Sequence, residues 1–349
     1  MRILATGGAG FIGSHVVCRL LDEGCEVLNV DKLTYAGSLD NLGEHQAHAN
    51  HGFSQTDICD AAAIKALLYK FKPDAIIHMA AESHVDRSID SPQTFIETNI
   101  TGTHNVIKAA YDFWSDLSDA AQKSFRFIHL STDEVFGALS DGQEAFNESS
   151  PYSPNSPYAA SKASSDLLVR SYWKTYGFPA IIVNSSNNYG PRQFPEKLIP
   201  LMVLNALEEK KLPVYGDGRQ VRDWLFVEDH VEALWTVINK GVPGETYCIG
   251  GDCEIRNLDL VHMICDVLDQ NRPRAEGESY KDLIEFVTDR PGHDFRYAID
   301  IAKIKNDLGW APQETFKQRL EKTIIWYSRE QGYVADRHDR QRQGKAGAK

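Results

Sequence analysis

Short runs of apolar residues alternate with longer amphipathic segments along the first half of the chain. The runs at residues 2–5, 26–30, 52–57, 75–79, 125–130 and 178–183 have the length and flanking residues of strands. The segments 15–23, 61–71, 95–114 and 158–176 have the pattern of helices. Repeated strand–helix units predict an α/β fold with a Rossmann-type, doubly wound parallel sheet.

The pattern becomes irregular after residue 186, where proline and glycine are more frequent. Short strands are predicted at 224–227 and 247–250, with a helix at 229–238 between them. We therefore expect a smaller α/β lobe that is interleaved with the sheet. Residues 1–186 and about 222–250 would form the larger domain, and about 187–221 and 251–333 the smaller lobe. The tail at 336–349 is polar, so we expect it to be disordered.

Composition excludes several classes of protein. The 349 residues are 42% hydrophobic and 25% charged, as in ordinary soluble globular proteins. A net charge of −12 argues against a nucleic-acid partner, which would require a basic face. We find no leader and no apolar run of about 20 residues, so we expect no membrane association and a cytoplasmic location. The six cysteines form no C-x-x-C pair, which favours reduced thiols and no metal site.

A glycine-rich loop follows the first predicted strand. Gly7, Gly10 and Gly13 form a shifted version of the G-x-G-x-x-G pattern, which allows a tight turn and close approach of the backbone to a pyrophosphate. Asp31 ends the second strand, where a carboxylate is expected to bind the ribose hydroxyls of NAD and to repel the extra phosphate of NADP. Lys32 offsets that repulsion only weakly. The alternative is a glycine turn without a ligand, but the strand–loop–helix–strand context favours NAD.

The candidate catalytic residues follow the strand at 125–130 and begin the helix at 158–176. Tyr158 and Lys162 are four positions apart and share one helix face. An ammonium group beside a phenol favours the phenolate, so Tyr158 is a candidate general base. Thr132 can hydrogen-bond the substrate hydroxyl at the sheet edge where α/β proteins bind ligands. Asp133 and Glu134 provide more acid–base groups there than a simple hydride transfer requires.

Each pattern also has a purely structural explanation. A tyrosine and a lysine four positions apart occur readily on surface helices, and an acidic pair after a strand commonly caps a helix. Ser83 and His84 either face the ligand crevice or cap a local turn. Basic residues in the second half are solvated surface charges by default, although as a set beside a cleft they would suit a diphosphate; they are Lys197, Arg219, Arg222, Arg290 and Arg296.

Several longer segments indicate a particular protein family. They are 31–37 (DKLTYAG), 80–88 (AAESHVDRS), 131–135 (STDEV), 186–191 (SNNYGP), 194–200 (FPEKLIP), 222–224 (RDW) and 289–294 (DRPGHD). On these segments the chain resembles, from residue 1 to about 333, the extended short-chain dehydrogenase/reductase family, and within it the nucleotide-sugar 4,6-dehydratases. Phe136 and Arg192 depart from the family pattern, in which tyrosine and an aromatic residue are frequent at these positions. These departures concern the sugar-side opening and the strictness of substrate choice.

The resemblance implies a redox-neutral reaction on a nucleotide sugar, with dTDP-glucose as the expected substrate. Tyr158, helped by Lys162, would take the proton from the sugar O4 while hydride passes from C4 to NAD. Glu134 would remove the C5 proton and Asp133 would protonate the departing C6 hydroxyl, so that water is lost. Hydride return to C6 would give the 4-keto-6-deoxy sugar and leave NAD bound and regenerated.

The resemblance also implies the contacts of both ligands, and hence an NAD-binding larger domain and a substrate-binding smaller lobe. The residues expected at NAD are Gly7, Gly10, Phe11, Ile12, Gly13, Asp31, Lys32, Leu33, Thr34, Asp57, Ile58, Ala80, Ala81, Thr98, Tyr158, Lys162 and Asn188. Those expected at the substrate are Ser83, Thr132, Asn187, Lys197, Leu198, Pro213, Val214, Tyr215, Arg222, Asn257, Asp289, Arg290, His293 and Tyr297. Family members usually dimerise through the helices placed here at 95–114 and 158–176, so we expect a homodimer.

Other functions remain compatible with parts of this pattern. A nucleotide-sugar 4-epimerase would share Tyr158, Lys162 and the NAD-binding fold but has no use for Asp133 and Glu134. A 4,6-dehydratase of a UDP-, CDP- or GDP-sugar would share the entire mechanism. A catalytically silent NAD sensor on the same fold is a third alternative, although it would have no reason to retain all five candidate catalytic residues.

Overall fold

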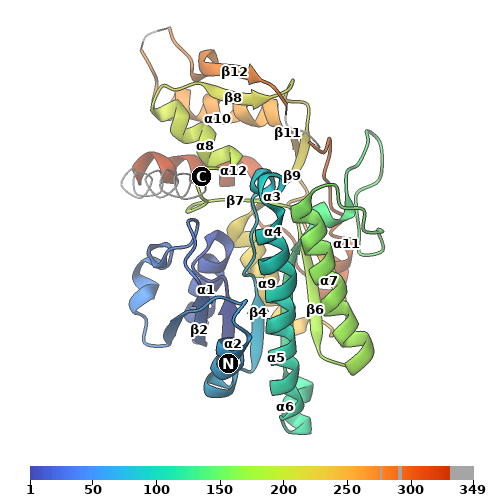
Figure 1. The fold of residues 1–349 in the computed structure, drawn as a ribbon. Helices are drawn as coiled ribbons and strands as arrows, with labels where there is room; N and C mark the ends of the chain where they lie inside the picture. The colour runs from blue at the N-terminus through green and yellow to red at the C-terminus, as the bar shows by residue number, and fades with distance from the viewer. Residues whose placement is uncertain (276, 290–292, 331–349) are drawn as a thin grey trace.

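A parallel sheet forms the centre of the larger part of the molecule (Figure 1). The computed structural model describes residues 1–275, 277–289 and 293–330. Within these residues the central sheet has seven strands in the order β10-β6-β5-β4-β1-β2-β3, and each strand is parallel to its neighbours. The strands are β1 (Arg2–Thr6), β2 (Glu26–Asp31), β3 (His51–Gln55), β4 (Ala75–His78), β5 (Arg126–Thr132), β6 (Ala180–Ser185) and β10 (Thr246–Ile249). This confirms the predicted Rossmann-type sheet.

Helices cover both faces of this sheet, because successive side chains of a strand point to opposite faces. Ile128 and Leu130 of β5 pack in the core shared with α1 (Phe11–Asp22), α9 (Val227–Lys240) and α11 (Ala302–Leu308). Phe127 of the same strand packs in the core shared with α2 (Ala61–Phe71), α5 (Thr103–Ser115) and α7 (Pro157–Tyr176). Each internal strand is therefore apolar on both faces, which explains the continuous apolar runs in the sequence.

The helix expected at 95–114 is interrupted in its hydrogen-bonding pattern. It consists of α4 (Pro92–Phe95), a π-helical segment (Ile96–Gly102) and α5. A Cβ atom on Gly102 would lie 2.6 Å from Cδ1 of Ile58, so this segment approaches the loop after β3 closely. The π-helical segment carries Thr98 and Asn99 towards the ends of the central strands. Neighbouring short helices are α3 (Val85–Asp90) and α6 (Asp119–Ser124), and the 3-10 helices span Leu39–Ala47, Asp133–Phe136 and Tyr280–Leu283.

The smaller lobe lies beyond the carboxyl ends of the central strands, at the top of Figure 1. In the described part of the chain it has a three-stranded sheet in the order β11-β9-β7 and a two-stranded sheet of β12 and β8. These strands are β7 (Asn187–Tyr189), β8 (Leu212–Tyr215), β9 (Val221–Phe226), β11 (Glu254–Arg256) and β12 (Ile284–Val287). They share a separate apolar core with α8 (Leu198–Leu207), α10 (Asn257–Asn271) and α12 (Phe316–Arg329).

The chain passes repeatedly between these two parts. Strand β9 falls within the segment 222–250 that the sequence assigned to the larger domain, yet it pairs with β7 and β11, whereas β10 joins the central sheet. The six cysteines form no disulfide among the described residues, and no helix there is long and apolar enough to cross a membrane. The predicted disordered tail at 336–349 lies outside the described residues.

Candidate active site

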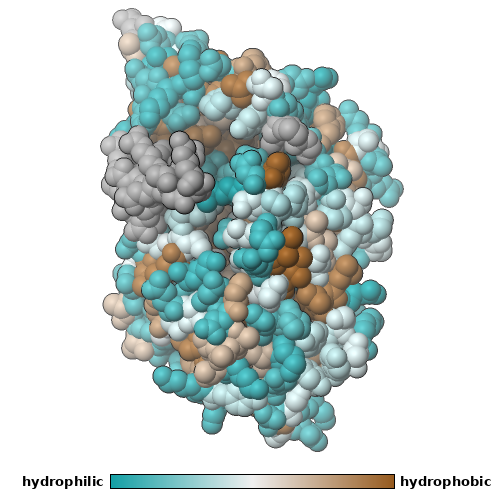
Figure 2. Space-filling model, in the orientation of Figure 1, coloured by the Kyte–Doolittle hydropathy of each residue, from teal (hydrophilic) through white to brown (hydrophobic). Residues whose placement is uncertain are grey.

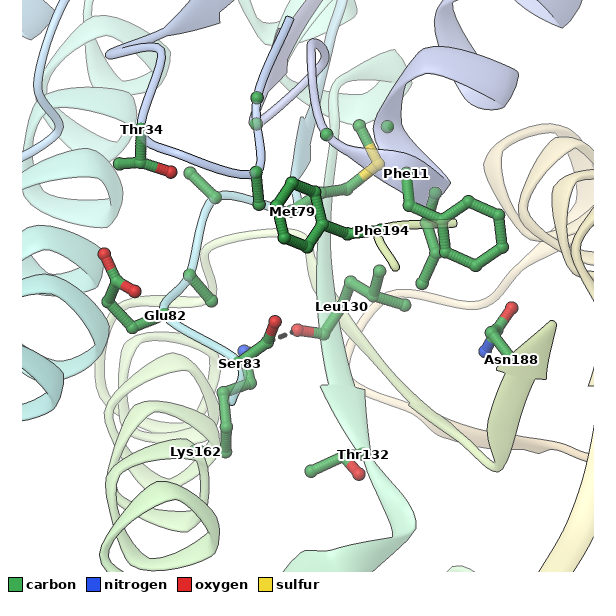
Figure 3. A pocket seen from close by; sticks show the side chains of 18 of the residues that line it. Phe11, Thr34, Met79, Glu82, Ser83, Leu130, Thr132, Lys162, Asn188 and Phe194 are labelled. Carbon is green, nitrogen blue, oxygen red and sulfur yellow. Dashed lines mark hydrogen bonds between the residues drawn. The ribbon is translucent and has the colours of Figure 1, made fainter. Parts of the chain in front are cut away.

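A cavity of about 310 Å³ opens at the carboxyl ends of the central strands, where the smaller lobe meets the sheet. This volume is in the range of small-molecule binding sites. Strands β1 and β4 are adjacent at its centre, and the connections after them lead away in opposite directions, as at the ligand-binding switch point of doubly wound sheets. Figure 2 shows the hollow between the two parts, and Figure 3 shows its lining from close by.

The glycine-rich loop between β1 and α1 forms one wall. Gly7 has a φ of +74°, and a Cβ atom there would lie 2.7 Å from backbone atoms of Ala80. A Cβ atom on Gly13 would lie 2.0 Å from the carbonyl oxygen of Gly7. Phe11 begins α1 beside the cavity, so the free N–H groups of this helix end are available to an anion. This glycine cradle fits the pyrophosphate of a dinucleotide.

Asp31, the last residue of β2, lies beside this loop and lines the cavity. Its Oδ2 accepts a hydrogen bond from the backbone N–H of Ala9 at 3.0 Å, and its Oδ1 accepts one from Leu33 at 2.8 Å. Burial raises the pKa of Asp31, and these two hydrogen bonds oppose the rise. The carboxylate is thus fixed in direction at the place where a ribose would be bound. NAD fits this wall of the cavity.

The opposite wall is the carboxyl end of β5. Thr132 is the last residue of the strand, and its Oγ1 accepts a hydrogen bond from the backbone N–H of Glu134 at 3.3 Å. It also donates to Oδ1 of Asp133 at 3.2 Å. The Oδ2 atom of Asp133 is buried and has no hydrogen-bond partner among the described residues. Burial, followed by the charges of Glu134 and Asp223, raises the pKa of Asp133 well above its usual value. Asp133 is therefore held as a neutral acid.

Tyr158 and Lys162 reach this edge from the first turns of α7. The helix begins after Ser156, whose hydroxyl accepts a hydrogen bond from the backbone N–H of Ala159, with Pro157 in the first turn. Lys162 is buried and its Nζ donates to the carbonyl oxygen of Leu130 at 2.7 Å, as Figure 3 shows. Burial lowers the pKa of Lys162 to about 8, against the opposing charge of Asp166.

The protonation of Tyr158 differs from the sequence-based expectation. We expected Lys162 to favour the phenolate, but burial and then the charge of Glu134 raise the pKa of Tyr158, with a smaller rise from Asp133. A hydrogen bond with Thr132 opposes this only in part. The chain by itself therefore keeps Tyr158 as a neutral phenol. The carboxylates lie on another element, so the spacing of Tyr158 and Lys162 could not reveal their effect.

Most of the expected cofactor and catalytic residues line this single cavity. They are Gly7, Gly10, Phe11, Ile12, Gly13, Asp31, Lys32, Thr34, Ile58, Ala80, Ala81, Thr98, Thr132, Asp133, Glu134, Tyr158, Lys162 and Asn188. Two expected NAD contacts do not line it. Leu33 has a φ of 58° and supports Asp31 through its backbone, and Asp57 lies 3.3 Å from Nζ of Lys32.

The expected substrate residues divide into two groups. Ser83, Thr132, Asn187 and Lys197 line the cavity, and Nζ of Lys197 donates to the carbonyl oxygen of Ser83 at 3.2 Å. The others lie outside its lining, in or beside the smaller lobe: Leu198, Pro213, Val214, Tyr215, Arg222, Asn257, Asp289, His293 and Tyr297. Arg290 lies outside the described residues.

The second group is connected around Arg222 of β9. Its guanidinium donates to the carbonyl oxygens of Val221 and Asp294, at 2.7 and 2.9 Å, and lies 4.4 Å from the ring centre of Tyr297. Nδ1 of His293 donates a hydrogen bond to Oδ1 of Asp289 at 2.7 Å. The charge of Arg222 acts on the pKa of Asp133, and that of Glu134 on Tyr297, so this group adjoins the catalytic edge.

Several residues that line the cavity were not predicted as ligand contacts, among them the polar or aromatic residues Glu82, Phe194 and Glu196. Glu196 accepts a hydrogen bond from the hydroxyl of Tyr35 at 2.9 Å, and the ring of Phe194 packs edge-on against Tyr35 at 5.2 Å. All three lie in segments that the sequence had singled out. Their sequence positions give no sign that the loop after β2 and the segment before α8 meet over the cavity.

The parallel sheet, the glycine cradle with Asp31, and the pair Tyr158 and Lys162 at the edge of β5 define a dinucleotide-dependent enzyme of the short-chain dehydrogenase/reductase class. Comparison with known proteins narrows this class. Residues 4–323 match a family model described as GDP-mannose 4,6 dehydratase. The chain belongs to this family of nucleotide-sugar 4,6-dehydratases.

Individual relatives cover nearly the whole chain. A dTDP-glucose 4,6-dehydratase of Shigella flexneri is 55% identical over 336 residues, which are 94% of this chain and 92% of the relative. The crystal structure of the Streptomyces venezuelae dTDP-glucose 4,6-dehydratase with NAD bound has a TM-score of 0.88 at 43% identity, covering 97% of this chain and 100% of that one. The Bacillus anthracis enzyme in complex with NAD has a TM-score of 0.85 at 42% identity, covering 97% and 99%.

Proposed function

We propose that this protein is a dTDP-glucose 4,6-dehydratase that uses NAD and forms dTDP-4-keto-6-deoxy-glucose and water. The observation that carries the proposal is the meeting of two neighbouring carboxyl groups, Asp133 and Glu134, with Tyr158 and Lys162 on one cavity. A dehydration needs a base and an acid in addition to the group that deprotonates the sugar hydroxyl. The identity of 55% to a relative of that activity supports the substrate.

Tyr158 and Thr132 act on the sugar hydroxyl at C4. Thr132 orients that hydroxyl, and Tyr158 accepts its proton. Lys162, fixed by the carbonyl oxygen of Leu130, supplies a positive charge near the phenol when it is protonated. This chain alone raises the pKa of Tyr158, and the positive charge of an oxidised nicotinamide, when bound, would act with Lys162 to lower it.

Glu134 and Asp133 divide the elimination between them. Glu134 is partly exposed to the cavity and removes the C5 proton. Asp133 is buried and kept protonated, so it can donate to the departing C6 hydroxyl. NAD, when bound, supplies the acceptor of hydride from C4 and its donor to C6, which makes the overall reaction redox-neutral. We infer that it stays tightly bound and is regenerated in each cycle.

The two ligands are assigned to the two parts of the chain. Residues 1–186 with about 227–250 are proposed to bind NAD, with Leu33 and Asp57 acting beside the cavity rather than in its lining. Residues about 187–226, which include β9, are proposed to bind the nucleotide sugar together with residues 251–333, with Arg222 and Arg290 at the diphosphate. The planar guanidinium of Arg222, held by backbone carbonyl oxygens, is suited to such an anion.

The residues of this site also bear on the alternative functions. A 4-epimerase would need Tyr158 and Lys162 but no protonated Asp133 beside Glu134, so the pair of carboxyl groups argues against it. A dehydratase of another nucleotide sugar would use an identical catalytic edge, and the relatives named for dTDP-glucose argue for that nucleotide. A silent NAD sensor would not require any of these four groups.

We further propose a homodimer in the cytoplasm. Ile89, Ile96, Leu167 and Tyr176 are between 44% and 55% exposed and lie on α3, the π-helical segment and α7. Figure 2 shows brown, apolar surface over this side of the molecule. Burial of such a surface against a second copy would stabilise a dimer. The product is a deoxysugar nucleotide, which fits a role in dTDP-rhamnose and polysaccharide biosynthesis.

The test is incubation of the purified protein with dTDP-glucose in deuterated water without added NAD, followed by NMR and mass spectrometry. A 4-keto-6-deoxy product with deuterium at C5 supports both the dehydratase and its retained cofactor. dTDP-galactose would show an epimerase, and turnover of only a UDP-, CDP- or GDP-sugar would change the nucleotide. No reaction with any sugar, even after NAD is added, would favour the sensor.

A further inference from the structure

A fully buried carboxyl group lies directly behind the catalytic edge and has no part in the mechanism above. Asp166 is four residues after Lys162 on α7, so the two side chains lie on the same side of the helix, one turn apart. The side chain of Asp166 is 0% exposed. A charge in such a place is retained only where other groups compensate it.

Three donors converge on one oxygen of Asp166. Its Oδ2 accepts hydrogen bonds from the hydroxyl of Ser131 at 2.7 Å, the hydroxyl of Tyr152 at 3.0 Å and the amide of Asn184 at 3.3 Å. These donors come from β5, the loop before α7 and β6. Three hydrogen bonds therefore anchor this oxygen to three segments outside α7.

The positive charge that balances Asp166 has two candidate carriers. Oδ1 of Asp166 lies 3.1 Å from Nε2 of His129 on β5, and Lys162 is one helical turn away. Burial, followed by the charge of Lys162, lowers the pKa of His129. The ring of His129 also stacks on that of His78, whose pKa is lowered by burial, His129 and Lys162. His129 and His78 are therefore neutral, which leaves Lys162, one helical turn from Asp166, as the cation whose pKa Asp166 raises.

Lys162 and Asp166 form hydrogen bonds with two consecutive residues of β5, Leu130 and Ser131. Lys162 donates to the carbonyl oxygen of Leu130, and Asp166 accepts from the side chain of Ser131. Asn184, which donates to Asp166, also donates to the carbonyl oxygen of Thr132 at 3.0 Å. The three residues that lead to Asp133 are thus tied to one helix face.

We propose that Asp166 is a positioning residue of the active site: it supplies the counter-charge that keeps buried Lys162 protonated, and it fixes the end of β5 that carries Thr132 and Asp133. The role given to Lys162 rests on the proposed function. The charge coupling itself does not, because it is a property of the protein without substrate or cofactor.

Removal of the charge has a defined direction of effect. In Asp166→Asn the pKa of Lys162 should fall from about 8 by about one unit or more, because the buried ammonium loses the negative charge that raises its pKa. Ser131, Tyr152 and Asn184 keep a polar partner in this variant. Tyr152→Phe is the matched control: it removes one hydrogen bond to the carboxylate but leaves the charge, so the pKa of Lys162 should change by only a few tenths of a unit.

The measurement is an NMR titration of NAD-free protein labelled with ¹³C at the lysine Cε atoms. The Lys162 signal is identified by its absence in Lys162→Met. A folded Asp166→Asn protein with an unchanged pKa of Lys162 would overturn the proposal. Should that variant not fold, Asp166→Ser removes the same charge. The titration of the wild-type protein is a test by itself. A Lys162 pKa of about 5–6, as found for buried lysines without a counter-charge, would overturn the proposal.

The pH dependence of turnover gives a second readout. Burial raises the pKa of Tyr158, and the negative charges of Glu134 and Asp166 raise it further. Without Asp166 the pKa values of both Tyr158 and Lys162 fall, so both limbs of the pH–rate profile should move to lower pH. A merely structural role would lower the rate at every pH without moving the limbs. If no sugar is turned over, the proposed function fails while the NMR titration still tests the charge coupling.

Discussion

The catalytic edge and the nucleotide-binding side of the proposed active site are built in different ways. At the catalytic edge Thr132, Asp133, Tyr158 and Lys162 are all buried and come from the end of β5, the 3-10 helix directly after it and α7. The residues proposed to bind the substrate nucleotide come from β8, β9, α10 and the segment after β12. Arg222 and Tyr297 are buried here too, but Tyr215 is 40% exposed. Asp289 is exposed as well.

This difference separates reactivity from recognition. Burial is what shifts the pKa values at the catalytic edge, because desolvation is the largest cause for Asp133, Tyr158 and Lys162 alike. An exposed site could not hold a neutral aspartic acid beside a glutamate. The nucleotide-binding side instead needs side chains that extend to the nucleotide and carry a charge complementary to it. Substitutions at the catalytic edge should therefore change kcat, and substitutions on the nucleotide-binding side should change KM.

The largest effect is expected from Tyr158→Phe. Loss of the phenol removes the group that accepts the O4 proton, and general acid–base groups contribute about 10²–10⁴-fold to rates. kcat should fall by this factor, and bound NAD should no longer be reduced when dTDP-glucose is added. The absorbance of reduced NAD in single-turnover experiments measures this step. Turnover equal to the wild type would exclude Tyr158 as the base.

Glu134→Gln should have a small effect on oxidation at C4 and a large effect on the loss of water. Oxidation at C4 does not use Glu134, so some bound NAD should still be reduced, while the release of water slows by about 10²-fold or more. The glutamine also removes a negative charge that raises the pKa values of Tyr158 and Asp133. Full dehydration by this variant, followed by deuterium incorporation at C5, would show that another group is the C5 base.

Sequence spacing predicted the catalytic edge far better than its electrostatics. Thr132, Asp133, Glu134, Tyr158 and Lys162 are close in sequence to a strand end or a helix start, and they line one cavity as expected. The direction of the pKa shift of Tyr158 was predicted wrongly. It depends on burial and on Glu134, which sits on another element, and no periodicity within α7 carries that information.

The sequence also did not predict which distant segments contact one another. Asp166 looked like an ordinary polar position of α7, yet its partners Ser131, Tyr152 and Asn184 come from three other segments. The seven-stranded sheet follows from alternating strands and helices, whereas the pairing of β9 with β7 and β11 does not, because short strands after residue 186 carry too few apolar positions to specify a partner.

Arg222→Lys should change recognition more than reactivity. Lysine keeps the positive charge that lowers the pKa of Asp133, but it lacks the planar fork of donors that suits a diphosphate. We expect KM for dTDP-glucose to rise about 10-fold while kcat stays within about threefold, since charge-assisted hydrogen bonds contribute about 1.5–3 kcal/mol. Arg219→Lys is the matched control, because Arg219 is exposed and pairs with Asp217. A fall in kcat alone would place Arg222 with the catalytic edge.

The smallest effect is expected where the two sides touch. The hydroxyl of Tyr35, in the loop after β2, donates to Glu196 in the segment that leads into α8, and Glu196 lines the cavity next to Lys197. Tyr35→Phe removes this hydrogen bond and keeps the ring that packs on Phe194. A neutral hydrogen bond contributes about 1 kcal/mol, so KM or the rate of NAD release should change by about fivefold, with kcat unaltered. Tyr69→Phe, which loses a similar bond to Asp116 on the surface, is the control. Steady-state kinetics and the NAD content after gel filtration measure the two outcomes. If kcat falls instead, the contact acts on the chemical steps, and the separation between a reactive edge and a recognising lobe does not hold at this point of the cavity.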